Sequence, residues 1–165
     1  AMRFENKVLF VTGGASGIGF ATAERVVAEG GRAALVDLDL GRAEEAASRL
    51  PGCIGLAANV ADETAVASAV AATVERLGGI DLVLAAAGHA EFGPVAEWDP
   101  ARLSRMLEVH IGGTFHVCKH ALPVMKQRLA APPHLVAVIV HQPPRRPVSS
   151  AMTPRESMPQ ASMWP

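Results

Sequence analysis

A glycine-rich segment near the N-terminus carries the strongest chemical signal in this sequence, with TGGASGIG at residues 12–19. It lies between an apolar, strand-like run at 7–12 and a helical pattern at about 18–29. Glycines in such a turn let the chain reverse, let backbone N–H groups reach a ligand and let helix and strand pack closely. The helix N-terminus adds free N–H donors and a positive dipole that favour an anion. The segment therefore predicts a phosphate-binding loop that comprises Gly13, Ser16, Gly17, Ile18 and Gly19.

The spacing of these glycines is Gly-x3-Gly-x-Gly, which differs from the general Gly-x-Gly-x2-Gly pattern of dinucleotide-binding folds. No Lys-Ser/Thr pair follows the glycines, so the segment is not a nucleoside-triphosphate P-loop. A purely structural turn is the alternative. The position of the segment at the start of a strand–helix–strand unit favours binding.

An acidic residue closes the second strand-like run, at 32–37. The carboxylate of Asp37 can accept hydrogen bonds from an adenosine ribose, and it would repel a 2′-phosphate. Ser16 in the loop supplies no positive charge that would attract such a phosphate. These residues predict NAD rather than NADP as the ligand. The alternative is a solvated aspartate at a strand end.

Strand and helix patterns alternate along the first 140 residues. We expect strands at 7–12, 32–37, 53–58, 80–87 and 135–140, with helices at 18–29, 42–50, 62–77 and from 100 onward. Asp62 and Asp99 are suitable N-caps, and Pro100 suits a first helical position. This order predicts an α/β fold of the Rossmann type, an open parallel sheet of about five strands with helices on both faces.

Composition narrows the class of protein. Half of the 165 residues are hydrophobic, and the net charge of -1 with no basic block gives no indication of nucleic-acid binding. No apolar run reaches the roughly 20 residues of a membrane helix, and no signal peptide is evident. Cys53 and Cys118 follow no metal or redox spacing, which favours reduced thiols and a cytoplasmic protein.

Three later segments, together with the glycine loop, resemble the short-chain dehydrogenase/reductase family over about residues 5–140. They are Asn59-Val60, AAAG at 85–88 and VHIGGTF at 109–115. The resemblance implies that NAD is the cofactor and that Asn59 and Val60 contact its adenine. It also places Leu38, Ala87 and Gly88 among the cofactor-binding residues. Two family asparagines are alanine here, at 85 and 86, and His110 replaces the family's asparagine at a helix bend.

The resemblance also implies an oxidoreductase that interconverts an alcohol and a carbonyl compound. The family's chemistry uses a serine and a Tyr-x3-Lys pair, in which the tyrosine acts as the general acid and base. This sequence contains no tyrosine, and its last lysine is Lys126. We therefore assign no catalytic residue and expect the polypeptide to be inactive as sequenced. The alternatives are a non-catalytic NAD-binding module and a non-functional truncated fragment, and self-association stays open.

The C-terminal segment, 141–165, differs in composition from the rest. No glycine occurs after Gly113, and eight of the 12 prolines lie at or after Pro132. We expect an NAD-binding domain at 1–140 followed by an irregular, disordered tail. A frameshift accounts for this segment, because reading residues 157–165 one base upstream permits the string Tyr-Ala-Ala-Ser-Lys. The alternative is a genuine divergent tail. Ser149 and Ser150 do not directly follow a strand.

Histidines were considered as ligands and as acid/base groups. His116 and His120 are four residues apart on an expected helix, but no carboxylate or cysteine at suitable helical spacing completes a metal site. His110 could act as a weak acid or base near the nicotinamide, or it could be structural. His89 follows the fourth strand and could line the cofactor cleft. The sequence predicts no metal site.

Overall fold

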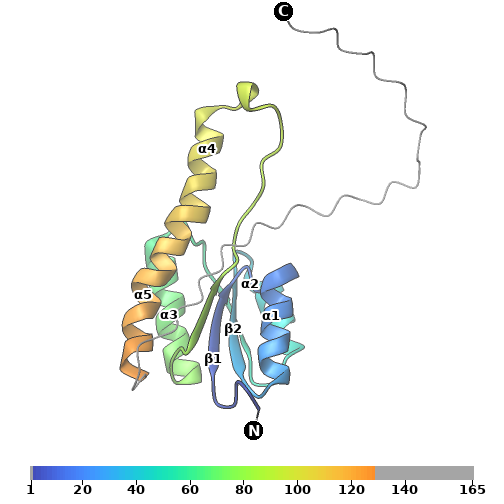
Figure 1. Cartoon of the computed structure of the whole chain (residues 1–165), viewed down its shortest axis with the longest axis vertical. Coiled ribbons are helices and arrows are strands. Elements are labelled where there is room, and N and C mark those ends of the chain that lie inside the picture. Colours follow the sequence, from blue (N-terminus) through green and yellow to red (C-terminus); the bar gives the residue numbers. More distant parts are fainter. Residues whose placement is uncertain (1, 129–165) are drawn as a thin grey trace, which may run out of the picture.

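A parallel β-sheet with helices on both faces forms the centre of the molecule (Figure 1). The structure is a computed structural model, and it describes residues 2–128. Its strands are β1 (Val8–Thr12), β2 (Arg32–Asp37), β3 (Ile54–Ala57) and β4 (Leu82–Ala85), in the order β3-β2-β1-β4. All paired strands are parallel. The predicted α/β, Rossmann-type fold is therefore confirmed.

The strand order reverses beside β1, because β2 and β4 flank it on opposite sides. In open α/β sheets, ligands bind in the crevice that forms at the carboxyl ends of the strands at such a reversal. Thr12, the last residue of β1, lies in register with Val36 and Ala85 on its two neighbours. The sequence motifs at 12–19, 37–38, 59–60 and 86–88 consequently follow strands that end at the same edge.

Alternate strand residues form two separate cores. Val8 and Phe10 pack with residues of α3 (Glu63–Leu77) and α5 (Gly113–Arg128). Leu9 and Val11 pack on the other face with α1 (Gly17–Ala28) and α2 (Leu40–Ser48). Every residue of β1 is buried because both faces of the strand are covered. Each fully buried large aliphatic or phenylalanine side chain contributes about 1.5–3 kcal/mol, so these layers fix the sheet firmly.

The helix ends follow the predicted capping chemistry at two places. The Asp62 carboxylate accepts hydrogen bonds from the N–H groups of Thr64 and Ala65 at the start of α3. Asp99 caps α4 (Pro100–Leu107) through the N–H of Ala101. The sequence placed the start of α2 at residue 42, which is two residues late, because Asp39 caps the helix and Leu40 already belongs to it.

The helix after β4 departs most from expectation. A short 3-10 helix, η1 (Val95–Glu97), precedes α4, and a π-helical turn, η2 (Glu108–Gly112), joins α4 to α5. Together α4, η2 and α5 form one long helix, whose α4 end extends beyond the sheet (Figure 1). Expected strands 53–58 and 80–87 are shorter in the structure, at Ile54–Ala57 and Leu82–Ala85. The strand expected at 135–140, the 140/141 boundary and the segment 141–165 lie outside the described residues.

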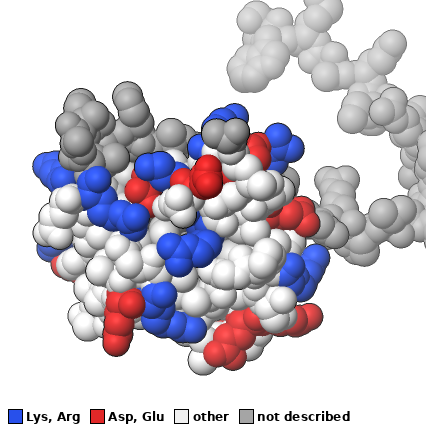
Figure 2. All heavy atoms as spheres, turned by 90° about the horizontal axis from the view of Figure 1, so that it is seen from below, with Lys and Arg blue, Asp and Glu red and all other residues white. Residues whose placement is uncertain are grey.

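Basic and acidic side chains are interspersed on the face of the molecule that Figure 2 shows. The described residues therefore form no strongly charged patch on that face. None of the helices between residues 2 and 128 combines the length and the apolar character needed to span a membrane. Cys53 and Cys118 are unpaired, and burial raises the pKa of the Cys53 thiol.

Candidate functional site

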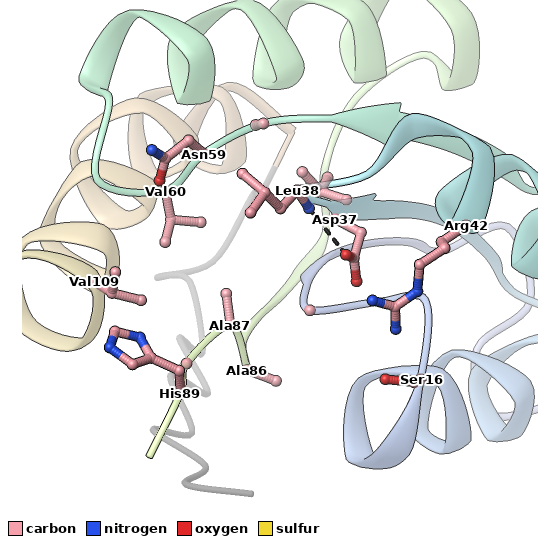
Figure 3. Close-up of a pocket in the computed structure, with 14 residues that line it drawn as sticks. Ser16, Asp37, Leu38, Arg42, Asn59, Val60, Ala86, Ala87, His89 and Val109 are labelled. Atoms are coloured by element: carbon pink, nitrogen blue, oxygen red, sulfur yellow. Dashed lines mark hydrogen bonds between the residues drawn. The ribbon is translucent and has the colours of Figure 1, made fainter. Parts of the chain in front are cut away.

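A cavity of about 280 Å³ lies at the carboxyl ends of the strands. Its volume is close to the lower end of the about 300–1,000 Å³ range of ligand-binding clefts. Eight of the eleven predicted binding residues line it, from four separate segments of the chain: Gly13, Ser16, Asp37, Leu38, Asn59, Val60, Ala87 and Gly88. The fold therefore brings together residues that are up to 75 positions apart, from 13 to 88, around one space (Figure 3).

The glycine loop folds tightly because side chains are excluded from it. Gly13 adopts a positive φ of 66°, and a Cβ there would lie 2.8 Å from the carbonyl oxygen of Ala86. A Cβ on Gly19 would overlap the carbonyl oxygen of Gly13. Gly17, Ile18 and Gly19 do not line the cavity, because they form the first turn of α1. Gly19 thus allows the helix to start against the loop.

The N-terminus of α1 is open to an anion. Ser16 is the N-cap residue, but its side chain makes no capping hydrogen bond. By contrast, Asp39, Asp62 and Asp99 cap α2, α3 and α4 with their carboxylates. The first N–H groups of α1 therefore lack a side-chain acceptor, and a phosphate group could accept from them.

Asp37 joins the loop to the end of β2. One carboxylate oxygen accepts from the N–H of Leu38 at 2.9 Å (Figure 3), and the other accepts from the N–H of Ala15 at 3.3 Å. A carboxylate can accept about four hydrogen bonds, so both oxygens retain lone pairs for ribose hydroxyl groups. Asp37 can therefore fix the phosphate loop and bind a sugar at once.

Residues of α5 hold the loop after β3 in place. The imidazole Nδ1 of His116 lies 2.9 Å from the carbonyl oxygen of Val60, and Gly113 leaves room for the Val60 side chain. The Asn59 side-chain oxygen accepts from the N–H of Ala61 at 3.1 Å, which fixes the orientation of its amide. Val60 is buried and Asn59 is exposed, so this loop offers both an apolar and a polar contact.

A second side chain of α5, that of His120, contacts the start of α3. Its Nε2 lies 3.0 Å from Glu63, whose carboxylate also pairs with Lys119 at 2.7 Å. The hydrogen bond from Lys119, and next that from His120, lower the pKa of Glu63. His116 and His120 therefore contact different partners, and the described residues contain no cluster of three or more metal-ligating side chains.

The segment after β4 lines the end of the cavity away from Asp37. The hydroxyl oxygen of Thr12 accepts from the N–H of Ala87 at 3.3 Å, and His89 and Val109 line the space beyond. His110 does not line the cavity, because its ring lies behind Gly88, where a Cβ would overlap it. The His110 Nε2 lies 2.8 Å from the carbonyl oxygen of His89, so the ring braces this segment.

Sequence reasoning missed several residues that line the cavity. Arg42 from α2 is the charged one among them; the others are Val36, Ala58, Ala86 and Val109. Val109 could have been found, since it begins the VHIGGTF segment. Arg42 carried no comparable signal, because its place at the cavity depends on how α2 packs against β2 and β3.

Comparisons with known proteins agree with this architecture. The model of the family described as short chain dehydrogenase matches residues 7–132. The 2-(S)-hydroxypropyl-CoM dehydrogenase 3 of Xanthobacter autotrophicus is 36% identical over 130 residues, covering 76% of this chain and 51% of the relative. D-threitol dehydrogenase of Mycolicibacterium smegmatis is 37% identical over 121 residues, covering 71% and 46%. The chain thus spans about half the length of these curated relatives.

Two solved structures from Brucella melitensis are similar. One, described as a glucose/ribitol dehydrogenase of the short-chain dehydrogenase/reductase type, has a TM-score of 0.72 and 35% identity, covering 75% of this chain and 54% of the other. The other is a 3-ketoacyl-(acyl-carrier-protein) reductase complexed with NADH, with a TM-score of 0.73 and 27% identity, covering 76% and 52%. The sequence match over residues 7–132 and the shared fold show that this chain belongs to the short chain dehydrogenase family.

Proposed function

We propose that this chain binds NAD(H) as the cofactor-binding part of an oxidoreductase that interconverts an alcohol and a carbonyl compound. One observation carries the proposal: the glycine loop, Asp37 and the segment after β4 line a single cavity at the reversal of the strand order. A related solved structure, the reductase from Brucella melitensis, is complexed with NADH.

The residues present fit such a dinucleotide from one end of the cavity to the other. The uncapped N-terminus of α1 offers N–H groups to the pyrophosphate, and the Asp37 carboxylate accepts from the adenosine ribose. We assign the adenine to Asn59 and Val60, which line the same cavity. Ala87 and Gly88 leave an open surface for the nicotinamide half, where the absence of bulky side chains lets a flat ring approach the backbone.

When bound, NAD(H) supplies or accepts the hydride of the reaction. The residues of this chain hold and orient the cofactor, and the bracing of Gly88 by His110 keeps the nicotinamide end of the cavity open. The 165 residues include no tyrosine that could transfer the proton to or from the substrate oxygen. We therefore propose that this polypeptide binds NAD(H) without turning over an alcohol.

The proposed substrate class of the family's reaction is a small alcohol or carbonyl compound, in keeping with the dehydrogenases named above. The NAD-binding domain that we propose spans 1–140, of which the structure describes 2–128. The cytoplasmic location expected from the sequence stays a prediction.

We also propose that the chain self-associates through an apolar stripe, defined as Leu103, Leu107, Ile111 and Phe115. These side chains recur every four residues along α4, η2 and α5, and each is about half exposed or more. An α-helix has fewer than four residues per turn, so side chains four residues apart shift gradually around its axis. The π turn at 108–112 has more residues per turn and offsets this shift, so the four side chains stay on one face. A straight stripe of this kind can pack against its own copy about a twofold axis.

Isothermal titration calorimetry of NAD+ into the 165-residue polypeptide tests the main proposal. We expect saturable binding of one NAD+ per chain, without oxidation of added alcohols. A folded protein that gives no binding heat and no protection against thermal unfolding at millimolar NAD+ would overturn it.

A further inference from the structure

The segment between β4 and α4, residues 86–99, is held by the helix that follows it. After β4 the chain extends beyond the sheet and returns as α4 (Figure 1). The first residues of the segment line the cavity, where His89 lies near Val109 at the end away from Asp37 (Figure 3). The later residues of the segment, from Glu91 on, do not line it. They contact α4 instead.

Arg102 of α4 makes most of these contacts. Its guanidinium donates two hydrogen bonds to one carboxylate oxygen of Glu91, at 3.1 and 2.8 Å, and one to the carbonyl oxygen of Phe92 at 3.2 Å. It also lies over the ring of Trp98, whose indole N–H donates to the carbonyl oxygen of Gly93. A planar guanidinium with five N–H donors can hold several groups at once. One side chain of α4 thus fixes the path of the segment.

The second carboxylate oxygen of Glu91 faces His89. It lies 3.9 Å from the imidazole Nε2, which is an ion-pair distance. The hydrogen bonds from Arg102 hold the pKa of the Glu91 carboxyl below its ordinary value, against the opposing effect of desolvation. Glu91 is therefore a charged group that is bound to Arg102 on one side and attracts the His89 ring on the other.

His110 holds the same segment at a different point. Its Nε2 lies 2.8 Å from the carbonyl oxygen of His89, so the π turn fixes the His89 backbone. Arg102 and Glu91 act on the His89 side chain instead. Loss of Arg102 should therefore release the imidazole ring and leave the cavity itself in place.

We propose that Arg102 is a positioning residue for the nicotinamide half of the bound cofactor, because it fixes Glu91, and Glu91 fixes the His89 imidazole where it contacts that half. This inference rests on the proposed function, since it concerns the same cofactor. Arg102 and Glu91 do not line the cavity, so both act through His89. A side chain that is ordered before the ligand arrives loses less conformational entropy on binding.

The test compares NAD+ with ADP-ribose, which lacks the nicotinamide, by isothermal titration calorimetry of the unmodified chain, Arg102→Gln and Arg105→Gln. Arg105 is an exposed arginine on the same helix that acts on Glu91 through its charge and makes no hydrogen bond to it, so its variant controls for the lost charge. We expect Arg102→Gln to weaken NAD+ binding about fivefold and ADP-ribose binding by less than about 1.5-fold, because only NAD+ reaches His89. Arg105→Gln should leave the ratio of the two affinities unchanged.

A double-mutant cycle tests whether Arg102 acts through His89. In the His89→Ala background, Arg102→Gln should have no further effect on NAD+ binding, whereas independent roles would add. Arg102→Lys keeps a cation beside Glu91 and should restore most of the NAD+ affinity. Thermal melts check that each variant is folded. If Arg102→Gln does not melt cooperatively, Glu91→Gln breaks the same contact from the other side and should give the same selective loss.

The outcomes separate this inference from the proposed function. A selective loss of NAD+ affinity that disappears in the His89→Ala background supports the positioning role. If NAD+ binds but Arg102→Gln weakens both ligands equally, weakens neither, or adds to the effect of His89→Ala, the role of Arg102 is overturned and the proposed function stands. If the folded, unmodified chain binds neither ligand, both are overturned.

Discussion

Asp37 holds the phosphate loop through its hydrogen bond from Ala15, and we propose that it also binds the adenosine ribose. Its carboxylate holds Ala15 of the phosphate loop and Leu38 of the next segment, and its remaining lone pairs face the cavity. The sequence indicated Asp37 from its place at a strand end, because a carboxylate at that position is exposed to the ligand side of the sheet. Its bond to Ala15 could not be predicted, since it depends on the exact path of the glycine loop.

Replacing Asp37 by alanine should weaken NAD+ binding about tenfold or more, because charge-assisted hydrogen bonds to the ribose are each worth about 1.5–3 kcal/mol. The change also removes the acceptor for the Ala15 N–H, so loop order should decrease together with affinity. Equilibrium titration with NAD+ measures the effect. Glu44→Ala removes an exposed carboxylate from α2 outside the cavity and serves as the matched control. Equal NAD+ affinities in the two variants would contradict the role of Asp37.

The long helix of α4, η2 and α5 covers the sheet and also holds the loop after β3 and the start of α3 in place. Through His116 it holds the Val60 carbonyl, and through Lys119 and His120 it holds Glu63 at the start of α3. The loop that we assign to the adenine is therefore fixed by an element far away in the sequence. The helical pattern predicted a helix from Pro100 onward, and the family resemblance placed a helix bend at His110, where the structure has the π turn. Gly113 follows the π turn directly, and a Cβ there would overlap the Val60 side chain.

The contacts of Glu63 with Lys119 and His120 should make the free energy of unfolding depend on pH. The hydrogen bonds from Lys119 and His120 lower the pKa of Glu63 in the folded chain below its ordinary value of 4.5. The carboxylate therefore stabilises the fold above that value, and the contribution is lost as the pH falls through the lowered pKa. Glu63→Gln should lower the melting temperature near neutral pH, and the difference from the unmodified chain should shrink in acid below pH 4.5.

Thermal melts across a pH series, followed by circular dichroism, measure this difference. Glu75→Gln, an exposed glutamate on the same helix, is the control. A difference between Glu63→Gln and the unmodified chain that stays constant into strong acid would show that the Glu63 carboxylate does not stabilise the fold through its charge.

The three layers together explain why the fold was easier to predict than the site. β1 and β2 are nearly all apolar because helices cover both of their faces, and that pattern is local. The bounds of α3 were equally local, since Asp62 caps its start and Gly78, with a φ of 85°, ends it. Arg42 and the bracing of Gly88 by His110 depend on contacts between layers. No single segment of sequence records those contacts.

The apolar stripe should decide the oligomeric state. Ile111 lies at its centre in the π turn and is 58% exposed. Ile111→Glu would place a charge in the apolar contact between two copies, so we expect a shift from dimer to monomer in sedimentation velocity. Ile18→Glu changes an exposed isoleucine outside the stripe and should leave the dimer intact. A monomeric unmodified chain at high micromolar concentration would contradict self-association.

The central claim is that NAD(H) occupies the cavity at the carboxyl ends of the strands. Amide chemical-shift mapping by NMR during an NAD+ titration tests it most directly, because it reports the location of the ligand as well as its binding. We expect the largest shifts at 13–19, 37–38, 59–60 and 87–88, with little change at the amino ends of the strands. Shifts that cluster elsewhere, or no shifts at all in the folded chain at saturating NAD+, would contradict this assignment.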